Sequence, residues 1–139
     1  MTAFFDMWRA RLDAFPQALL QLLMRFAIFW VFWRSGNLKA ANMDMAIGLF
    51  RDEYKLPILP PGIAAYLATA IELGAPCLIL AGLFTRLATL PLIAMTLTIQ
   101  FLVYPIDYPS HVLWFAILVF ILVRGPGPYS LDALLFKKR

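Results

Sequence analysis

The chain has 139 residues, of which 63% are hydrophobic and 14% charged, and its formal net charge is +4. A mean hydropathy of +0.79 lies well outside the range of soluble domains, so the composition predicts one domain embedded in a membrane. The single cysteine excludes an intrachain disulfide and a dithiol couple, and the single histidine excludes a bis-histidine haem or a multi-histidine metal site within one chain.

Residues 1–15 place large apolar side chains at helical spacing with charged residues between them, which predicts an amphipathic helix lying in the membrane interface. A first membrane span is predicted over residues 17–33, directly after Pro16. Gln21 and Arg25 lie four residues apart on this span. Because a polar ridge on a spanning helix faces protein rather than lipid, we expect both side chains to point inward.

Residues 34–61 are too polar and too often interrupted to span a membrane, and we expect a short surface helix over residues 38–50. The second span is predicted over residues 62–84, which is long enough to cross a hydrocarbon layer of roughly 30 Å. Glu72 lies near its midpoint, and Thr69 shares its face. Since a carboxylate in the bilayer centre is costly, Glu72 is expected to face the other helices.

The third span is predicted over residues 87–104, after a turn so short that it must form a hairpin with the second. The fourth span, over residues 109–124, ends at the sequence RGPGP, and Ser130 is placed to cap a short amphipathic helix. The predicted fold is an all-α, antiparallel four-helix transmembrane bundle in one domain, 1–139. Interfacial helices are expected at both ends and between the first two spans.

Four crossings would place both termini on the same side of the membrane. That side would collect Arg9, Arg11, Arg86, Arg124, Lys137, Lys138 and Arg139, against Arg34, Lys39, Arg51 and Lys55 on the other. The positive-inside rule then predicts cytoplasmic termini in a bacterial inner membrane. Because the basic residues lie at segment ends rather than in a stripe, they do not indicate binding to nucleic acid.

Arg25 and Glu72 are each near the middle of antiparallel spans, so they should lie at similar depth. We therefore predict a buried contact between them, in a polar centre that Gln21 and Thr69 complete. This pair could simply hold the helices in register, or it could bind a ligand or a proton. A Glu72→Gln variant that stays folded and fully functional would eliminate the second interpretation.

A second group of polar and aromatic residues surrounds the loop between the third and fourth spans: Gln100, Tyr104, Tyr108, His111 and Trp114. A quinone headgroup needs one or two hydrogen-bond donors and an apolar slot, and a histidine or tyrosine at the membrane boundary could provide the donor. An ordinary aromatic belt at the membrane surface would have the same composition.

Met43 and Met45 suggest a Cu(I) site, with His111 as a third ligand, because Cu(I) prefers soft sulfur ligands. A helix through these residues would point the two sulfurs to nearly opposite sides, and methionine more often fills gaps between apolar groups. The default expectation is therefore no metal site. Cys77 lies deep in the second span, where a thiol is expected to serve in packing.

Several motifs resemble the DoxX family of small bacterial membrane proteins. They are WRSG after the first span, Glu72 followed by Gly74, GLFTR before the third span, YPIDYPSHVLW and RGPGPYSLD. The resemblance covers the chain from about Phe15 to Leu135 and implies a four-helix membrane bundle. It also implies membrane subunits associated with thiosulfate oxidation and quinone reduction, or with responses to thiol, oxidative or copper stress.

The first expected function is a membrane subunit of a redox system, which gives a partner access to the quinone pool near His111 and Tyr104. Such a subunit would not be a complete oxidoreductase, because the chain carries no intrinsic cofactor beyond the quinone that it would bind. The alternative is a non-catalytic anchor or assembly partner for a thiol-, copper- or peptide-modifying system, working through residues 37–61. A small-solute transporter is a third possibility, although four short spans enclose little volume unless chains associate. We expect the chain to contact the lipid bilayer and to bind either a protein partner or a second copy of itself.

Overall fold

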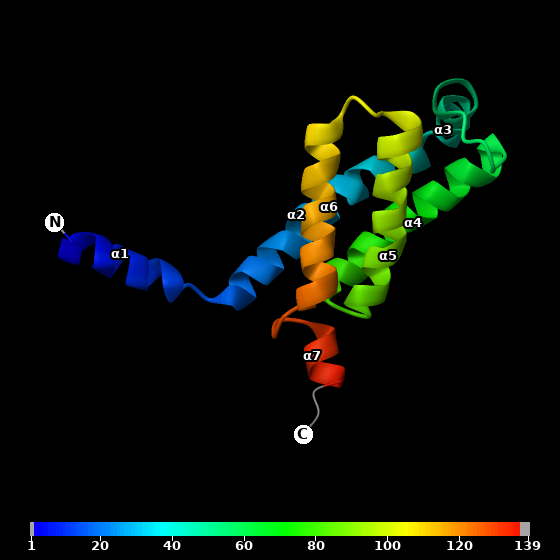
Figure 1. The fold of residues 1–139 in the computed structure, drawn as a ribbon. Helices are drawn as coiled ribbons and strands as arrows, with labels where there is room; N and C mark the ends of the chain where they lie inside the picture. The colour runs from blue at the N-terminus through cyan, green and yellow to red at the C-terminus, as the bar shows by residue number, and fades with distance from the viewer. Residues whose placement is uncertain (1, 137–139) are drawn as a thin grey trace.

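The computed structural model describes residues 2–136, and the terminal residues 1 and 137–139, including the basic end, lie outside it. The described residues form helices joined by short turns, with no β-strand among them (Figure 1). In chain order the elements are α1 (Thr2–Asp13), α2 (Gln17–Ala41), α3 (Met43–Leu49), the π-helical η1 (Phe50–Tyr54), α4 (Pro61–Ala81), α5 (Thr85–Thr98), the π-helical η2 (Ile99–Val103), α6 (Tyr108–Arg124) and α7 (Leu131–Leu135).

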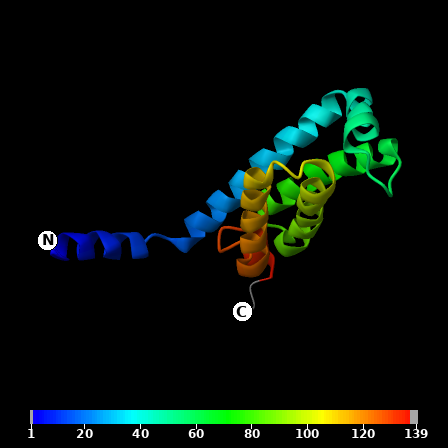
Figure 2. The ribbon, with the colours of Figure 1, turned by 45° about the horizontal axis from the view of Figure 1, so that its top comes forward.

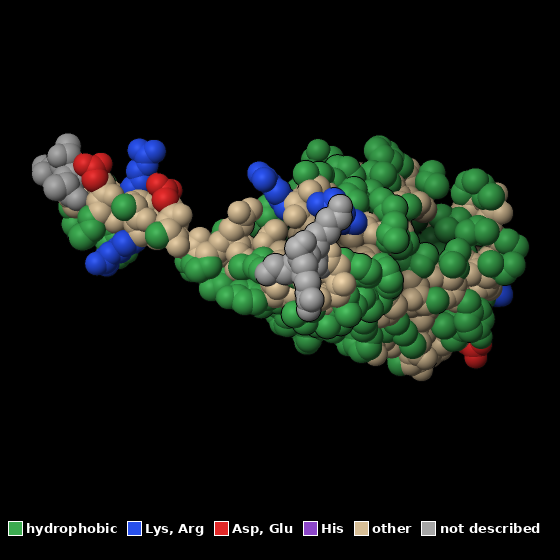
Figure 3. All heavy atoms as spheres, turned by 90° about the horizontal axis from the view of Figure 1, so that it is seen from below, with side chains coloured by type: hydrophobic (Ala, Val, Ile, Leu, Met, Phe, Trp, Pro, Cys, Tyr) green, Lys and Arg blue, Asp and Glu red, His purple; other side chains and the backbone are tan. Residues whose placement is uncertain are grey.

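Three helical segments are long and apolar enough to cross a membrane: Gln17–Ala41, Pro61–Ala81 and Thr85–Val103. The apolar helix Tyr108–Arg124 is shorter, at 17 residues. Hydrophobic side chains cover most of the face shown in Figure 3, and basic side chains gather beside the C-terminal end of the described chain. A surface of this kind is suited to contact with lipid.

The first helix of the bundle is longer than its apolar run. The helix continues past residue 33, where the membrane span was predicted to end, and reaches Ala41. Asn42 ends it and starts α3, where the Asn42 side chain accepts a hydrogen bond from the Met45 amide at 3.0 Å. The surface helix expected over residues 38–50 is therefore divided between the last turn of α2 and α3.

The four long helices form two pairs. In Figures 1 and 2, α2 and α4 run obliquely side by side, while α5 and α6 stand together as a hairpin joined at one end. Helix α4 ends at Gly82, whose left-handed φ of 72° would be strained for another residue, and Phe84 also adopts a positive φ at the start of α5. This compact turn brings α5 back against α4.

The main core joins all four long helices. Its buried members are Ile28, Phe32, Ala75, Ile79, Ala88, Leu92, Leu118 and Ile121. A close approach of α2 to α4 depends on Gly36, because a Cβ atom there would lie 2.9 Å from Cδ2 of Leu73. A second, smaller cluster lies where α3 and η1 pack on α4, and it consists of Ala46, Phe50, Ala64 and Ala65.

Helix α1 projects away from the rest of the molecule after the break at Pro16 (Figures 1 and 2). Its large apolar side chains are exposed, including Phe5 at 65% and Trp8 at 46%. Arg9 and Asp13 form a surface ion pair at 3.8 Å on the same helix.

Candidate ligand cavity

A cavity of about 600 Å³ lies between the α2–α4 pair and the α5–α6 pair, beneath η1. Its walls are mostly apolar, with Phe32, Ile71, Met95 and Trp114 among them. Polar groups enter it from five of the surrounding elements and their flanking residues: Ser35, Lys39, Tyr54, Glu72, Thr98, Tyr104, Asp107 and His111. An apolar hollow with a few convergent polar groups is the usual form of a small-molecule site.

Glu72 points inward, as expected, but its partner is Lys39. The Lys39 ammonium donates to the two Glu72 carboxylate oxygens at 2.8 and 3.0 Å and to Ser35 Oγ at 2.8 Å. The Ser35 hydroxyl also donates to Glu72, at 3.2 Å. The Lys39 and Glu72 side chains are only 13% and 4% exposed, so this is a buried ion pair on the cavity wall.

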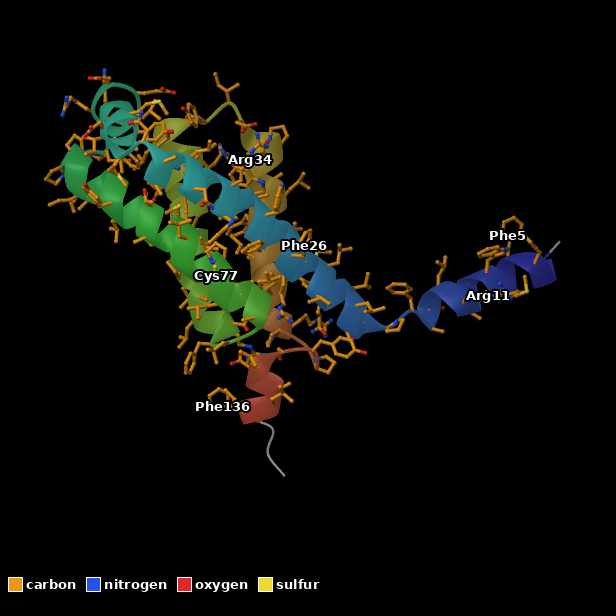
Figure 4. The ribbon with its side chains drawn as sticks, turned by 180° about the vertical axis from the view of Figure 1, so that it is seen from behind. Phe5, Arg11, Phe26, Arg34, Cys77 and Phe136 are labelled. Carbon is orange, nitrogen blue, oxygen red and sulfur yellow. The ribbon has the colours of Figure 1, made fainter. Side chains whose placement is uncertain are left out.

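The predicted contact between Arg25 and Glu72 is wrong. The Arg25 guanidinium donates instead to four backbone carbonyls: Ile79 at 2.7 Å, Pro126 at 3.1 Å, Tyr129 at 2.6 Å, and Leu80. Figure 4 shows α2 and α4 crossing side by side, with Phe26 on the first helix and Cys77 on the second. Arg25 therefore meets the end of α4, where the last helical carbonyls lack intrahelical partners, and lies about two turns from Glu72.

Gln21 and Thr69 are buried as predicted, at 8% and 6% exposure, but they do not join one polar centre. The Thr69 hydroxyl donates to the Ala65 carbonyl of its own helix at 2.8 Å. Gln21 packs against Gly127 of the C-terminal loop, where a Cβ atom would lie 2.3 Å from Gln21 Oε1. The four residues divide between the two ends of the bundle because α2 and α4 are offset along their axes.

The C-terminal segment completes the Arg25 end of the bundle. Asp132 accepts hydrogen bonds from the amides of Phe84 and Thr85 at 2.8 and 3.0 Å, and from the Thr85 hydroxyl at 2.9 Å. It therefore caps α5 from 47 residues away in sequence. Ser130 caps α7 as predicted, accepting from the Ala133 amide at 3.2 Å.

His111 is 3% exposed and lines the cavity together with Tyr104 and Trp114. Its ring lies 5.1 Å from that of Trp114. His111 Nδ1 pairs with Gln100 Oε1 at 2.8 Å, and Nε2 lies 3.7 Å from Asp107 Oδ2. Gln100 is not among the lining residues and contacts the cavity only through His111. Tyr108 is 61% exposed and is not among the lining residues, so its expected place in this group is wrong.

The two π-helical segments meet at one end of the cavity. Tyr104, which follows η2, donates to the Glu53 carboxylate of η1, and the rings of Tyr54 and Tyr104 are 5.7 Å apart in an edge-to-face arrangement. Burial raises the pKa of the Tyr54 phenol, and the hydrogen bond with Tyr104 partly opposes this. Tyr54 therefore keeps its proton at neutral pH and can act as a donor.

The residues of the copper hypothesis are not assembled. Residues 43–49 are helical, Met43 packs against the Ala46 cluster, and Met45 is 57% exposed. Among the described residues, no group of three or more His, Cys, Asp or Glu side chains is arranged to hold a metal ion. Cys77 is exposed on α4 rather than packed in the core.

The sequence reasoning missed Lys39 and Asp132. Lys39 continues the inward face of α2, which runs from Arg25 through Ile28, Phe32 and Ser35 at spacings of three and four residues. That periodicity could have revealed it, had the charge at Arg34 not been interpreted as the membrane exit. Asp132 carried no local signal, because the amides that it caps belong to a distant turn.

An all-helical chain with three to four apolar helices of spanning length is an integral membrane protein. Comparison with protein-family models matches residues 20–105 to the DoxX model, and the chain belongs to the DoxX family. The matched range includes Arg25, Lys39 and Glu72, whereas His111 lies beyond it. No curated protein and no solved structure matches the chain.

Proposed function

We propose that this protein is the membrane subunit of a redox system and that its cavity receives the headgroup of a quinone. The observation that carries the proposal is the buried Lys39–Glu72 pair beside an apolar hollow of about 600 Å³. This volume lies within the range of roughly 300–1,000 Å³ typical of small-molecule sites. A buried ion pair seldom adds net stability, so its position beside open space favours a role in binding.

The residues around the cavity fit such a headgroup. A quinone presents carbonyl oxygens on a flat apolar ring, and Lys39 and Tyr54 offer donors to those oxygens. Phe32, Ile71 and Trp114 offer apolar surface for the ring and the first part of the tail. When bound, a quinone supplies two-electron redox chemistry coupled to proton uptake or release.

Within this site each residue has a distinct role. Lys39 turns one of the three N–H groups that it gives to Glu72 and Ser35 toward a carbonyl oxygen and stabilises negative charge on that oxygen, while its remaining hydrogen bonds hold the ammonium in place. The apolar walls exclude water and so strengthen these interactions. Tyr54 adds a neutral donor from the η1 side.

The proposed subunit needs a protein partner and a membrane. A single cysteine and a single histidine leave the chain without a protein-borne two-electron carrier, so a protein partner would supply or receive the electrons. We place the protein in a bacterial inner membrane as an antiparallel bundle, with both termini cytoplasmic because the basic residues favour that side. The exposed apolar faces of α1 and α7 would lie in the interface, and a second copy of the chain is a further candidate partner.

The arrangement of tryptophans allows a direct test. The chain has four, and only Trp114 lines the cavity, while Trp30 and Trp33 border a separate surface depression and Trp8 lies on α1. A variant with Trp8, Trp30 and Trp33 changed to Phe therefore has one reporter in the site. A short-tailed quinone should quench its fluorescence in purified protein with saturable dependence on concentration.

Trp114→Phe alone is the matched control, because its three remaining tryptophans report only on quinone dissolved in the detergent or lipid. Equal, non-saturable quenching in both variants would overturn the proposal. Co-purification of a soluble protein through residues 37–61, together with that result, would instead support the anchor or assembly role.

A further inference from the structure

The orientation of the Gln100 amide is determined by its own hydrogen bonds. Gln100 Nε2 donates to the Pro105 carbonyl at 3.0 Å, which a carboxamide oxygen could not do. The oxygen of the amide must therefore be the atom that faces His111, at 2.8 Å from Nδ1. Amide orientations are assigned from such networks, and here the Pro105 carbonyl decides between the two.

This orientation selects one tautomer of the neutral imidazole. Because Gln100 Oε1 can only accept, His111 Nδ1 must carry the hydrogen. Nε2 of the neutral ring then carries a lone pair and no hydrogen. The nearest charged group to Nε2 is the Asp107 carboxylate at 3.7 Å, which also accepts and does not donate.

Two groups among the lining residues, His111 Nε2 in this tautomer and the Asp107 carboxylate, are therefore hydrogen-bond acceptors. A ligand carbonyl placed there would bring lone pairs against lone pairs, whereas a ligand hydroxyl would donate to Nε2. The Lys39 side does not discriminate in this way, since an ammonium can donate to a carbonyl or to a hydroxyl oxygen.

Building on the proposed function, we infer that His111 Nε2 accepts a hydrogen bond from a hydroxyl of the ligand, so that the cavity binds a quinol more tightly than the corresponding quinone. Gln100 is the positioning residue that holds His111 in the accepting tautomer. The sequence suggested that His111 donates to a quinone carbonyl. In this inference it instead accepts from a quinol hydroxyl.

Nitrogen NMR of protein labelled with ¹⁵N-histidine tests the tautomer directly, because the chain has one histidine. When the ring is neutral, the spectrum should show a protonated Nδ1 and an unprotonated Nε2. Gln100→Glu keeps the acceptor and should keep this tautomer, whereas Gln100→Leu should lose it. A protonated Nε2 in the unaltered protein overturns the inference.

Binding of a short-tailed quinol and its quinone to the same purified protein, measured by calorimetry under anaerobic conditions, tests the preference. We expect the quinol to bind about tenfold more tightly, the effect of one satisfied rather than mismatched hydrogen bond. It should also shift the Nε2 resonance. Gln100→Leu, which retains the histidine, and His111→Phe should each bring the two affinities to within about twofold, while the exposed Tyr108→Phe should leave the preference unchanged.

The possible results separate the two proposals. Equal affinities, or tighter binding of the quinone, overturn the inference about His111 and leave the quinone site intact. Failure of both forms to bind overturns the proposed function and this inference with it.

Discussion

Helix α2 carries two inward-facing cations, and their surroundings differ completely. Arg25 lies at one end of the bundle, where four backbone carbonyls from α4 and the C-terminal loop surround its guanidinium. Lys39 lies near the other end, where Glu72 and Ser35 hold its ammonium beside a cavity. Arg25 is not among the residues that line that cavity.

This difference indicates that Arg25 stabilises the fold, whereas Lys39 is placed to bind a ligand. The donors of Arg25 are taken up by fixed backbone groups, so the side chain connects segments that are more than 50 residues apart in sequence. Lys39 and Glu72 neutralise one another but keep one side toward open space, where a ligand can compete for or add to their hydrogen bonds. Burial alone does not distinguish these two cases, whereas the space beside the charge does.

The largest expected effect on stability is at Arg25. Arg25→Met removes a donor from four carbonyls, of which Ile79 keeps the Gly82 amide, and should lower the free energy of unfolding by about 3–5 kcal/mol, measured by SDS titration with circular dichroism. Fluorescence quenching at Trp114 should remain saturable in the fraction that is folded. A loss below about 1 kcal/mol would contradict the structural role of this residue.

At the Lys39–Glu72 pair, ligand binding should be lost even where stability is recovered. Lys39→Met strands a buried carboxylate and should cost about 3 kcal/mol of unfolding free energy, whereas the double variant Lys39→Met, Glu72→Leu should cost less than the single one. The double variant should nevertheless bind the quinone at least tenfold more weakly. A stable double variant with unchanged ligand affinity would make the pair purely structural.

Replacing Asp132, like replacing Arg25, should lower stability without weakening ligand binding, but by a smaller amount. Asp132→Ala removes the cap of α5 and should cost about 1–2 kcal/mol in the same unfolding assay, without changing the affinity of the cavity. Asp132→Asn, which keeps one acceptor oxygen, should recover part of the loss. A larger effect on ligand affinity than on stability would show that the two ends of the bundle are coupled.

The smallest expected effect is at the tyrosine beside η2. Tyr104→Phe removes the hydrogen bond to Glu53 and should cost about 1 kcal/mol or less, while changing ligand affinity a few-fold because Tyr104 lines the cavity. Tyr108→Phe, on an exposed side chain, is the matched control and should change neither quantity. Equal behaviour of the two variants would exclude the tyrosine from the site.

Several helix boundaries were predictable because strong local signals mark them. Prolines begin α2 and α4, Gly82 ends α4, and the short turn to α5 forces a hairpin. The end of α2 was not predictable in this way, since Arg34 and Ser35 have the composition of an exit from the membrane. Their helix continues because α2 packs closely on α4 through Gly36, and this buries Ser35 and Lys39 against Glu72.

Part of the site was also predictable. Glu72, Tyr104, His111 and Trp114 are in the cavity because an inward carboxyl and residues near one short loop converge in any hairpin arrangement of these helices. The partner of Glu72 was not predictable, because equal distance from the ends of two spans gives equal depth only if both helices have the same length and tilt. Helix α2 is 25 residues long and α4 is 21. Because the two helices are offset, Glu72 meets Lys39 rather than Arg25.

By itself, the sequence determined that the chain is helical, that it belongs in a membrane and that Glu72 faces inward, because hydropathy and helical periodicity are local properties of the chain. Only the tertiary structure decided which cation meets Glu72, that Arg25 holds the C-terminal loop, and that a cavity opens between the helix pairs. Those outcomes depend on how far one helix slides along another, and that distance is set by contacts such as Gly36 against Leu73, which join residues remote in sequence.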